Sequence, residues 1–304
     1  MAKHPTTLEQ FRSFCFQNKA TDFEQALEYF AVFGGMGWKV DLELSLERLI
    51  MSKVLDNYRY IHGDIAKITQ SDRTHHKMLS GIALGDRREH SAFKRAQVLR
   101  EEGEESIDFL VQNDLLIRDV SQAKPLNERE EVSDKFFISL PFLRFWFAYV
   151  SPYYKSVRDG DYSEVKAHLE HLKQGFTDLI YEQLVMEAVK KSFVEDPIES
   201  IGSYWDKNSE IDILAKTKSG KIVAGAIKLS KSKAKKSEVS KLKEQCAKIE
   251  IDADVLIIFS KSGFSNELKK EKSATLKLLT LKHLKSLTDD LSDKDLLVNT
   301  NKKY

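Results

Sequence analysis

The stretch that decides the fold is SEIDILAKTKSGKIVAGAIKLS, residues 209–230. Its two halves, residues 209–216 and 220–230, are rich in isoleucine and valine, and the polar sequence KSG separates them. Short runs of this kind on either side of a glycine-containing turn are typical of a β-hairpin. We therefore predict two antiparallel strands that pair symmetrically about Ser219.

The predicted register brings charged side chains together. Asp212 faces Ala226, and Glu210 faces Lys228, with directly opposed side chains ~5 Å apart on one face of the sheet. Alternation sends the apolar neighbours to the other face. These neighbours are Ile211, Ile213, Val223, Ile227 and Leu229. A shift of one residue would move every side chain to the opposite face, so the predicted site depends on this register.

An acid on one strand and an acid-x-Lys sequence on the next form the layout of a metal-dependent nuclease site. Mg²⁺ takes oxygen ligands, usually one or two carboxylates together with substrate phosphate, and it activates water for attack. Asp212 supplies the first acid, and Lys228 can stabilise the developing charge. A preceding helix usually adds a carboxylate, and Glu182 and Glu187 are available in the helix that we expect over residues 162–192.

The segments after the hairpin alternate between helix and strand. Residues 237–250 have helical periodicity, with Ser237 as the expected N-cap. DVLIIFS at 254–260 is the continuous apolar run of a strand that is covered on both faces. TLKLLTL at 275–281 is a further strand. The order helix, hairpin, helix, strand and strand predicts an α/β sandwich in the C-terminal half.

The N-terminal half is predicted to be mostly helical, because residues 21–33 and 44–60 place apolar side chains at helical spacing. Thr21 or Asp22 can cap the first of these helices. No G-x-x-x-x-G-K-[ST] sequence occurs in the chain, which excludes a P-loop nucleotide site.

Residues 91–140 have the element order of a winged helix-turn-helix. One helix ends at Gly103, a second helix follows, and strands at 115–120 and 135–140 flank a polar loop that contains Pro125. The acids in and just before the second helix are Glu101, Glu102, Glu104, Glu105, Asp108 and Asp114. Such a helix would repel phosphates, so the charge favours a packing or protein-binding scaffold over DNA recognition.

Residues 141–154, PFLRFWFAYVSPYY, are densely aromatic and close to helical spacing. An aromatic stripe of this kind is more often packed core than a ligand site. We expect it to connect two modules. The predicted organisation is a helical and winged-helix domain over 1–140, an aromatic connecting segment over 141–161, and a nuclease-like α/β domain over 162–304.

Charge is distributed unevenly, although Lys+Arg is 48 and Asp+Glu is 47. All twelve arginines lie between Arg12 and Arg158, and residues 216–248 contain eleven lysines against two acids. Lysines can neutralise phosphates without reading base sequence; the alternative is a solvated loop and helix face. The lysines that we expect to contact DNA are Lys231, Lys233, Lys235, Lys236 and Lys241.

Several segments together carry a resemblance to a known family. SDKFFISLPFLRFWFAYVSPYY at 133–154, GFTDLIYEQL at 175–184, IGSYWDKNSEIDILA at 201–215 and GAIK at 225–228 resemble an uncharacterised archaeal and bacterial family. The resemblance implies a winged helix followed by a PD-(D/E)XK nuclease-like domain of the restriction-endonuclease-like type. This pair of modules is commonly found C-terminal to a P-loop (AAA-like) ATPase. The implied fold class is α/β in the C-terminal part and α+β overall.

The chain departs from the family pattern at two points. The family strand usually reads Gly-Glu-x-Lys, whereas Ala226 stands at the acidic position here, and the ATPase module is missing. By match to the family motif, Glu182, Asp212 and Lys228 remain as catalytic residues, with Asp212 and Glu182 as ligands for Mg²⁺. Plainer interpretations are that Lys228 pairs with the facing Glu210 and that Glu182 is an ordinary helix residue. Asp212, between two isoleucines, is costly to bury without a partner or a metal.

Three functions remain open at this point. The first is a nucleic-acid-associated protein with a degenerate, inactive nuclease-like domain. The second is an active Mg²⁺-dependent nuclease that uses Glu182 or Glu210 with Asp212 and Lys228. The third is a protein-interaction or regulatory module for a separate ATPase, with the acidic helix of the winged-helix module as its docking surface.

Composition and the N-terminal sequence limit the cellular compartments in which we expect the protein. No apolar run reaches the ~18–20 residues of a membrane span, and the N-terminal sequence MAKHPTTLEQ has no signal-peptide pattern. The two cysteines, Cys15 and Cys246, are too far apart in sequence to indicate a metal pair or a disulfide framework. We therefore expect a cytoplasmic protein without a membrane partner.

Overall fold

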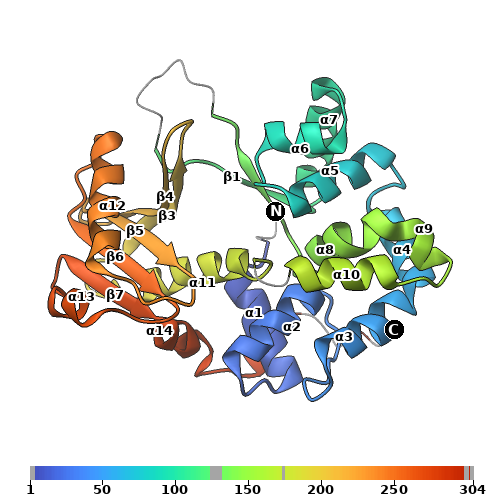
Figure 1. Ribbon diagram of the computed structural model, residues 1–304, viewed down its shortest axis with the longest axis horizontal. Coiled ribbons are helices and arrows are strands. Elements are labelled where there is room, and N and C mark those ends of the chain that lie inside the picture. The colour runs from blue at the N-terminus through green and yellow to red at the C-terminus, as the bar shows by residue number, and fades with distance from the viewer. Residues whose placement is uncertain (1–3, 124–131, 173–174, 298–300, 302–304) are drawn as a thin grey trace. The chain divides into compact units, whose positions relative to one another are not determined.

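The computed structural model describes residues 4–123, 132–172, 175–297 and 301 (Figure 1). The chain divides into two compact units. The segments of unit 1 are Met1–Asp119, Ser133–Thr177 and Leu291–Tyr304, and those of unit 2 are Val120–Val132 and Asp178–Asp290. Unit 1 is mainly helical and unit 2 contains a five-stranded sheet, which confirms the predicted fold class, α/β within an α+β chain.

Unit 1 begins with helices α1 (Thr7–Asn18) and α2 (Phe23–Phe33), which pack against each other through phenylalanine rings. Asp22 caps α2, because its carboxylate accepts a hydrogen bond from the backbone N–H of Gln25 at 2.7 Å. The helix predicted over 21–33 is thus confirmed, and Asp22 is its cap.

The next segment of unit 1 is also helical. Helix α3 (Leu46–Leu49) continues into a π-helical turn (Ile50–Leu55), and α4 (Tyr58–Ile68) and α5 (Arg73–Leu84) follow. The periodicity at 44–60 therefore reflects a helical region, but one that changes its hydrogen-bonding pattern along its length.

Two helices and a hairpin then follow in the predicted order. Helices α6 (Glu89–Ala96) and α7 (Arg100–Gln112) precede β1 (Leu116–Asp119) and β2 (Lys135–Ile138). The two strands pair antiparallel. The order of these elements is as predicted, but the boundary between the two helices is not.

Gly103 lies inside α7 and does not end a helix, contrary to the sequence prediction. The break comes earlier, after Ala96, where Gln97 has a left-handed backbone conformation with φ 53°. A Cβ at Gly103 would lie 2.4 Å from ring carbons of Phe93, so the glycine allows α7 to approach α6 closely. Pro125, which we placed in the loop between the strands, lies outside the described residues.

The aromatic segment forms part of the core of unit 1. It contains α8 (Pro141–Phe145), a π-helical turn (Trp146–Val150) and α9 (Tyr154–Arg158). The ring of Phe142 lies 4.8 Å from the ring of Trp38, measured between centroids, and both side chains are buried. The aromatic side chains of α8 and the π-helical turn are therefore packing residues.

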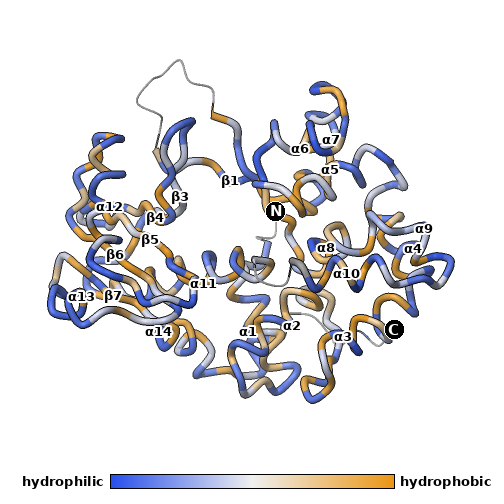
Figure 2. Tube along the Cα trace, in the orientation of Figure 1, coloured by the Kyte–Doolittle hydropathy of each residue, from blue (hydrophilic) through white to orange (hydrophobic). Residues whose placement is uncertain are grey.

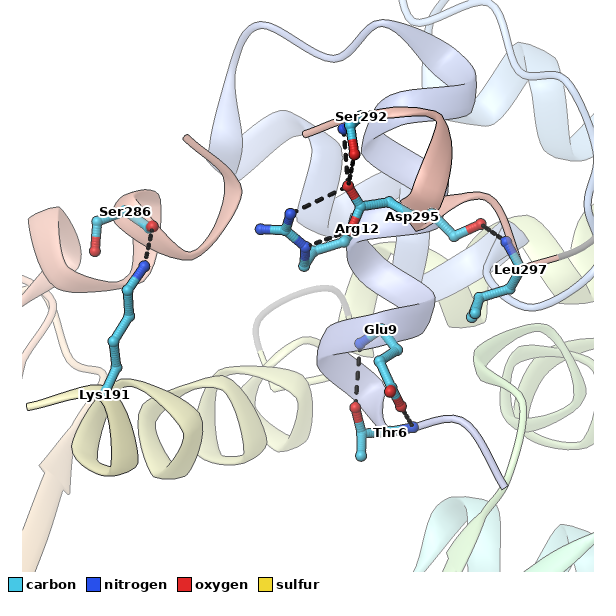
Figure 3. A network of polar contacts seen from close by, with 9 residues as sticks. Thr6, Glu9, Arg12, Lys191, Ser286, Ser292, Asp295 and Leu297 are labelled. Atoms are coloured by element: carbon cyan, nitrogen blue, oxygen red, sulfur yellow. Dashed lines mark hydrogen bonds and ion pairs between the residues drawn. The ribbon is translucent and has the colours of Figure 1, made fainter. Parts of the chain in front are cut away.

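Helix α10 (Ser163–Leu172) and the C-terminal residues complete unit 1. Arg12 donates two hydrogen bonds to the carboxylate of Asp295, from Nε at 2.7 Å and from Nη2 at 3.1 Å (Figure 3). The backbone N–H of Leu297 donates to Ser13 Oγ at 3.1 Å. The C-terminal segment therefore folds onto α1.

The sheet of unit 2 has the order β3-β4-β5-β6-β7. The strands β3 (Ile198–Trp205), β4 (Glu210–Thr217) and β5 (Ile222–Lys228) are antiparallel neighbours, whereas β6 (Val255–Ser260) and β7 (Leu276–Thr280) run parallel to β5. The last four were predicted from sequence and β3 was not. Strands β5 and β6 are mostly in the hydrophobic colours of Figure 2, as buried strands require.

Helices α12 (Lys236–Lys248) and α13 (Asn266–Lys270) cover one face of this sheet. Their buried side chains form one hydrophobic cluster with side chains of β4, β5, β6 and β7. The α12 members of that cluster are Val239, Leu242 and Cys246. Because α12 connects the parallel strands β5 and β6, the β5-α12-β6 segment is a crossover unit.

Helices α11 (Asp178–Lys191) and α14 (Leu281–Lys285) pack against each other in the same unit. Lys191 donates to the backbone carbonyl of Ser286 at 2.9 Å (Figure 3). The single helix predicted over 162–192 is wrong, because α10 and α11 are separate helices. Within the part of the chain that the structure describes, no helix combines the length and apolar character needed to cross a bilayer.

Candidate functional site

The β4–β5 ladder has the register that the sequence predicts. Ile213 pairs with Gly225, and Leu214 pairs with Ala224. These pairs are symmetric about Ser219, which confirms the predicted turn. The hairpin therefore brings Asp212, near the start of β4, and the last residues of β5 to the same end of the sheet.

Strand β4 contains a β-bulge at Asp212. Between the pairs Gly202–Leu214 and Tyr204–Ile211, β4 has one residue more than β3. The extra residue places Ile211 in the hydrophobic cluster beneath α12, together with Leu214. The prediction that Ile211 points to the other face is therefore wrong. Bulges re-aim side chains and are frequent next to functional sites.

Asp212 is half-buried, and its charge has a backbone partner. Its Oδ2 accepts a hydrogen bond from the N–H of Ile227 at 2.7 Å. This bond lies just beyond the last ladder pair, Ile213–Gly225, and holds the carboxylate close to Ala226. A half-buried carboxylate that accepts such a bond does not require a metal for its stability.

Lys228, the last residue of β5, forms an ion pair with Glu238. Its Nζ donates to Oε1 of Glu238 at 2.9 Å, and the two side chains are 25% and 22% exposed. This hydrogen bond lowers the pKa of Glu238. The sequence suggested the facing Glu210 as the partner, and it did not single out Glu238. The crossover connection is the signal that could have found it, since a helix that follows a parallel strand begins above the end of that strand.

Ala226 and Lys228 lie on the α12 face of the sheet, since Ala226 packs against the cluster beneath α12 and Lys228 binds Glu238 of that helix. On the opposite face, Lys277 of β7 donates to the carbonyl of Ser192, just after α11, at 2.9 Å. This contact places α11 on that opposite face. Glu182, a half-buried residue of α11, is therefore on the helix across the sheet from Ala226 and Lys228.

The remaining acids lie elsewhere in unit 2. Glu210 begins β4 and is exposed, and its backbone carbonyl accepts from Nε2 of Gln245 at 3.0 Å. Glu187 pairs with Lys190 along α11 at 2.7 Å. Among the described residues, no three His, Cys, Asp or Glu side chains gather where they could hold a metal ion.

The segment between β5 and α12, residues 229–235, carries lysines on an anchored backbone; we call it the lysine loop. Ala234 is fully buried and forms a parallel bridge with Phe264. Its N–H donates to the carbonyl of Gly263, and its carbonyl accepts from the N–H of Ser265, both at 2.9 Å. Since neighbouring side chains of an extended backbone point in opposite directions, the inward Ala234 turns its neighbours outward.

Three lysines of the loop are exposed and form no ion pair within the described part of the chain: Lys231, Lys233 and Lys235. The other two predicted contacts are also exposed but have acidic neighbours. Lys236 pairs with Glu271 at 2.5 Å, and Nζ of Lys241 lies 3.9 Å from Glu238. The free positive charge of the segment is therefore concentrated in the loop.

Helix α12 begins directly after the loop, with Lys235 as its N-cap residue and no side-chain cap. Ser237, the predicted cap, lies in the first turn instead. Cations at the amino end of a helix oppose the helix dipole by ~0.3–1 kcal/mol each, whereas anions are stabilised there. The start of α12 thus adds to the preference of this surface for anions.

Helix α7 of unit 1 has the opposite charge. Its exposed acids are Glu101, Glu102, Glu105 and Asp108. Glu104 pairs with Arg100 along the helix at 2.6 Å. Helix α7 therefore offers an acidic surface, as the sequence predicts.

Residues 146–241 match the model of a family, DUF234, that is described as archaeal and bacterial proteins of unknown function. The matched segment is less than half of the chain, and it includes Asp212, Ala226, Lys228 and the lysine loop. This agrees with the resemblance to an uncharacterised archaeal and bacterial family. Comparison with curated proteins and with solved structures gives no match.

Proposed function

We propose that this chain is a nucleic-acid-associated protein. Unit 2 is a degenerate PD-(D/E)XK nuclease-like domain that holds phosphates with its lysine loop and does not cleave them. The contrast around the end of β5 carries the proposal. Ala226 stands where the acid-x-Lys sequence needs its acid, while the exposed lysines of the loop follow directly after Lys228.

The order of elements supports both domain assignments. In unit 2, a helix, three antiparallel strands, a crossover helix and a parallel strand agree with the nuclease-like architecture that the resemblance implies. In unit 1, α6, α7, β1 and β2 have the order of a winged helix. The acidic surface of α7 suits a protein partner better than DNA, so nucleic acid is assigned to unit 2.

Two features support the loss of catalysis: few carboxylates are available to Mg²⁺, and one of them already accepts a backbone hydrogen bond. Mg²⁺ dehydrates reluctantly and needs carboxylates in a suitable arrangement. Asp212 already accepts a backbone hydrogen bond, and Ala226 supplies no oxygen. Glu182 is on the helix of the other face. Asp212 alone would hold the ion weakly.

Binding of a labelled DNA duplex, measured by fluorescence anisotropy from 50 to 300 mM KCl, tests the proposal. The variant Lys231→Gln/Lys233→Gln/Lys235→Gln removes three cations from the loop. Its slope of log affinity against log salt should fall by about 2.7, or 0.9 for each lost phosphate contact.

The matched control changes the same number of exposed lysines at the hairpin turn: Lys216→Gln, Lys218→Gln and Lys221→Gln. It should keep a slope close to that of the unaltered chain. Equal losses in both variants would show a response to net charge only. Absence of binding by the unaltered chain would refute the proposal and favour the protein-interaction module.

One observation favours an active Mg²⁺-dependent nuclease as a second candidate. Glu238 brings a carboxylate to the face of the sheet on which Ala226 lacks one, next to Lys228. Cleavage of DNA and RNA with Mg²⁺ or Mn²⁺ tests this candidate. Activity that is abolished by Asp212→Asn and by Glu238→Gln would establish it and overturn the degenerate-site proposal.

A further inference from the structure

We infer that unit 2 binds double-stranded nucleic acid through its phosphates alone, without preference for base sequence. This inference rests on the proposed function and specifies the class of nucleic acid. It depends on which side chains unit 2 exposes and which it buries.

The cations of the surface are lysines. The larger segment of unit 2, Asp178–Asp290, contains no arginine, and the one arginine of its other segment, Arg129, lies outside the described residues. The planar guanidinium forms bidentate bonds to guanine and stacks on bases. Lysine is a compact point charge, which neutralises a phosphate but offers no such fork. Between its lysines the loop has only small residues, Ser232 and Ala234, neither of which can reach far into a groove.

The aromatic residues of unit 2 are buried. Tyr181, Phe193, Tyr204, Trp205, Phe259 and Phe264 are all of its Phe, Tyr and Trp residues, and none is more than 8% exposed. Its one histidine, His283, is exposed and accepts a hydrogen bond at Nδ1 from the N–H of Thr280 at 3.0 Å, but it belongs to α14, which packs against α11 and not against the lysine loop. Single strands are held largely by bases that stack on exposed rings, and among its described residues unit 2 exposes no Phe, Tyr or Trp ring.

A surface that acts by charge alone favours the ligand with the denser charge. A duplex carries one negative charge per ~1.7 Å of its axis, and each neutralised phosphate contributes ~0.9 to the salt slope, against ~0.7 for a single strand. For three loop lysines, affinity between 50 and 200 mM salt should fall about 40-fold for a duplex and about 20-fold for a single strand.

The test compares four ligands of equal length with the full chain: a mixed-sequence duplex, an A·T-rich duplex, a G·C-rich duplex and a single strand. The three duplexes should bind with affinities within about threefold of one another. The single strand should bind about threefold more weakly at 150 mM salt, and with the shallower slope. A single strand that binds as tightly as the duplex, or a tenfold preference among the duplexes, would overturn the inference.

The variant Ser232→Trp provides a gain-of-function test, because it places an aromatic ring among the loop lysines at an exposed position. Single-strand affinity should rise about fivefold or more, while duplex affinity stays within about twofold. No change for the single strand would count against the loop as the contact surface.

Failure of all four ligands to bind at 50 mM salt would instead refute the proposed function itself. Phosphatidylserine vesicles that bind as tightly as the duplex would overturn the duplex assignment.

Discussion

Glu238 sets how many cations around β5 are available to an anionic ligand. Its carboxylate lies 2.9 Å from Nζ of Lys228 and 3.9 Å from Nζ of Lys241. Attraction between two charges 4 Å apart is ~1 kcal/mol in water and ~4 kcal/mol near a protein surface. A polyanion that brings several phosphates to the surface can therefore compete for both lysines, although it must first displace the glutamate.

We expect Glu238→Gln to strengthen nucleic-acid binding, because it frees Lys228 and Lys241 for phosphates. The salt slope should rise by up to about 1.8, which is two added contacts at ~0.9 each. Glu244→Gln is the matched control, since it removes the same charge from an exposed position of the same helix. Equal gains in both variants would mean that net charge, and not release of the two lysines, controls binding.

At the scale of elements, local patterns predict what local contacts determine. The turn at Ser219 and the alternation around it are sufficient for the β4–β5 register. The bulge at Asp212 was not predictable in this way, because it arises from pairing with β3. The sequence of β3 did not identify that segment as a strand. The Lys228–Glu238 pair likewise depends on the path of the crossover and not on either residue's neighbours.

Gly103 shows the same limit, since glycine in a sequence indicates a helix break, while its real role is packing against α6. The added Cβ of Gly103→Ala would collide with Phe93, at a cost of about 1–3 kcal/mol. Helix propensity returns ~1 kcal/mol, so the substitution should destabilise the chain by up to about 2 kcal/mol.

Gly63 in α4 is the matched control for this substitution, because a Cβ there would meet nothing within 4 Å. Gly63→Ala should stabilise the chain by about 0.5–1 kcal/mol. Thermal and urea unfolding of both variants measure the two effects. Stabilisation by both substitutions would show that the α6–α7 contact is loose.

Helix α5 carries a second prediction at this scale, on pH. Burial lowers the pKa of His75 and of His76, so both are mainly neutral in the folded state near neutral pH. The unfolded chain binds protons at these residues below pH ~6.5, where the folded chain still resists them. The two neutral histidines therefore contribute fully to the free energy of unfolding above that pH, and their contribution is lost as the pH falls below it.

The contacts explain the burial. His75 bonds to Ser106 Oγ at 2.8 Å and stacks on Phe109, and His76 bonds to Thr69 Oγ1 at 2.7 Å. Asp72 opposes the shift at both residues, and His62 adds to it at His76. The double variant His75→Phe/His76→Phe should reduce the loss of Tm between pH 7.5 and 5.5, whereas substitution of the exposed His90 by Gln should not. An unchanged profile in the double variant would contradict the prediction.

At the scale of the whole molecule, the chain is interleaved, because unit 1 includes residues from both sides of unit 2. The ion pair between Arg12 and Asp295 joins positions 283 residues apart in the sequence. No local pattern around Asp295 could have indicated its partner. The side chains of Arg12 and Asp295 are only 17% and 15% exposed, so their bidentate contact is shielded from water and salt.

We expect Asp295→Asn to destabilise unit 1 by about 1.5–3 kcal/mol, because it removes the charged acceptor of two hydrogen bonds from the partly buried Arg12 guanidinium. The matched control is Asp159→Asn, which removes the acid of an exposed pair with Arg158; that change should stay within ~0.5 kcal/mol. Urea unfolding gives the two free energies of unfolding, and proteolysis under native conditions reports release of the C-terminal segment.

The bonds from Arg12 also lower the pKa of Asp295, so the unaltered chain should lose this contribution to its stability as the pH falls below about 3.8. Equal stability of the two variants at pH 7, with no earlier cleavage near residue 295, would show that the contact does not hold the end of the chain on α1.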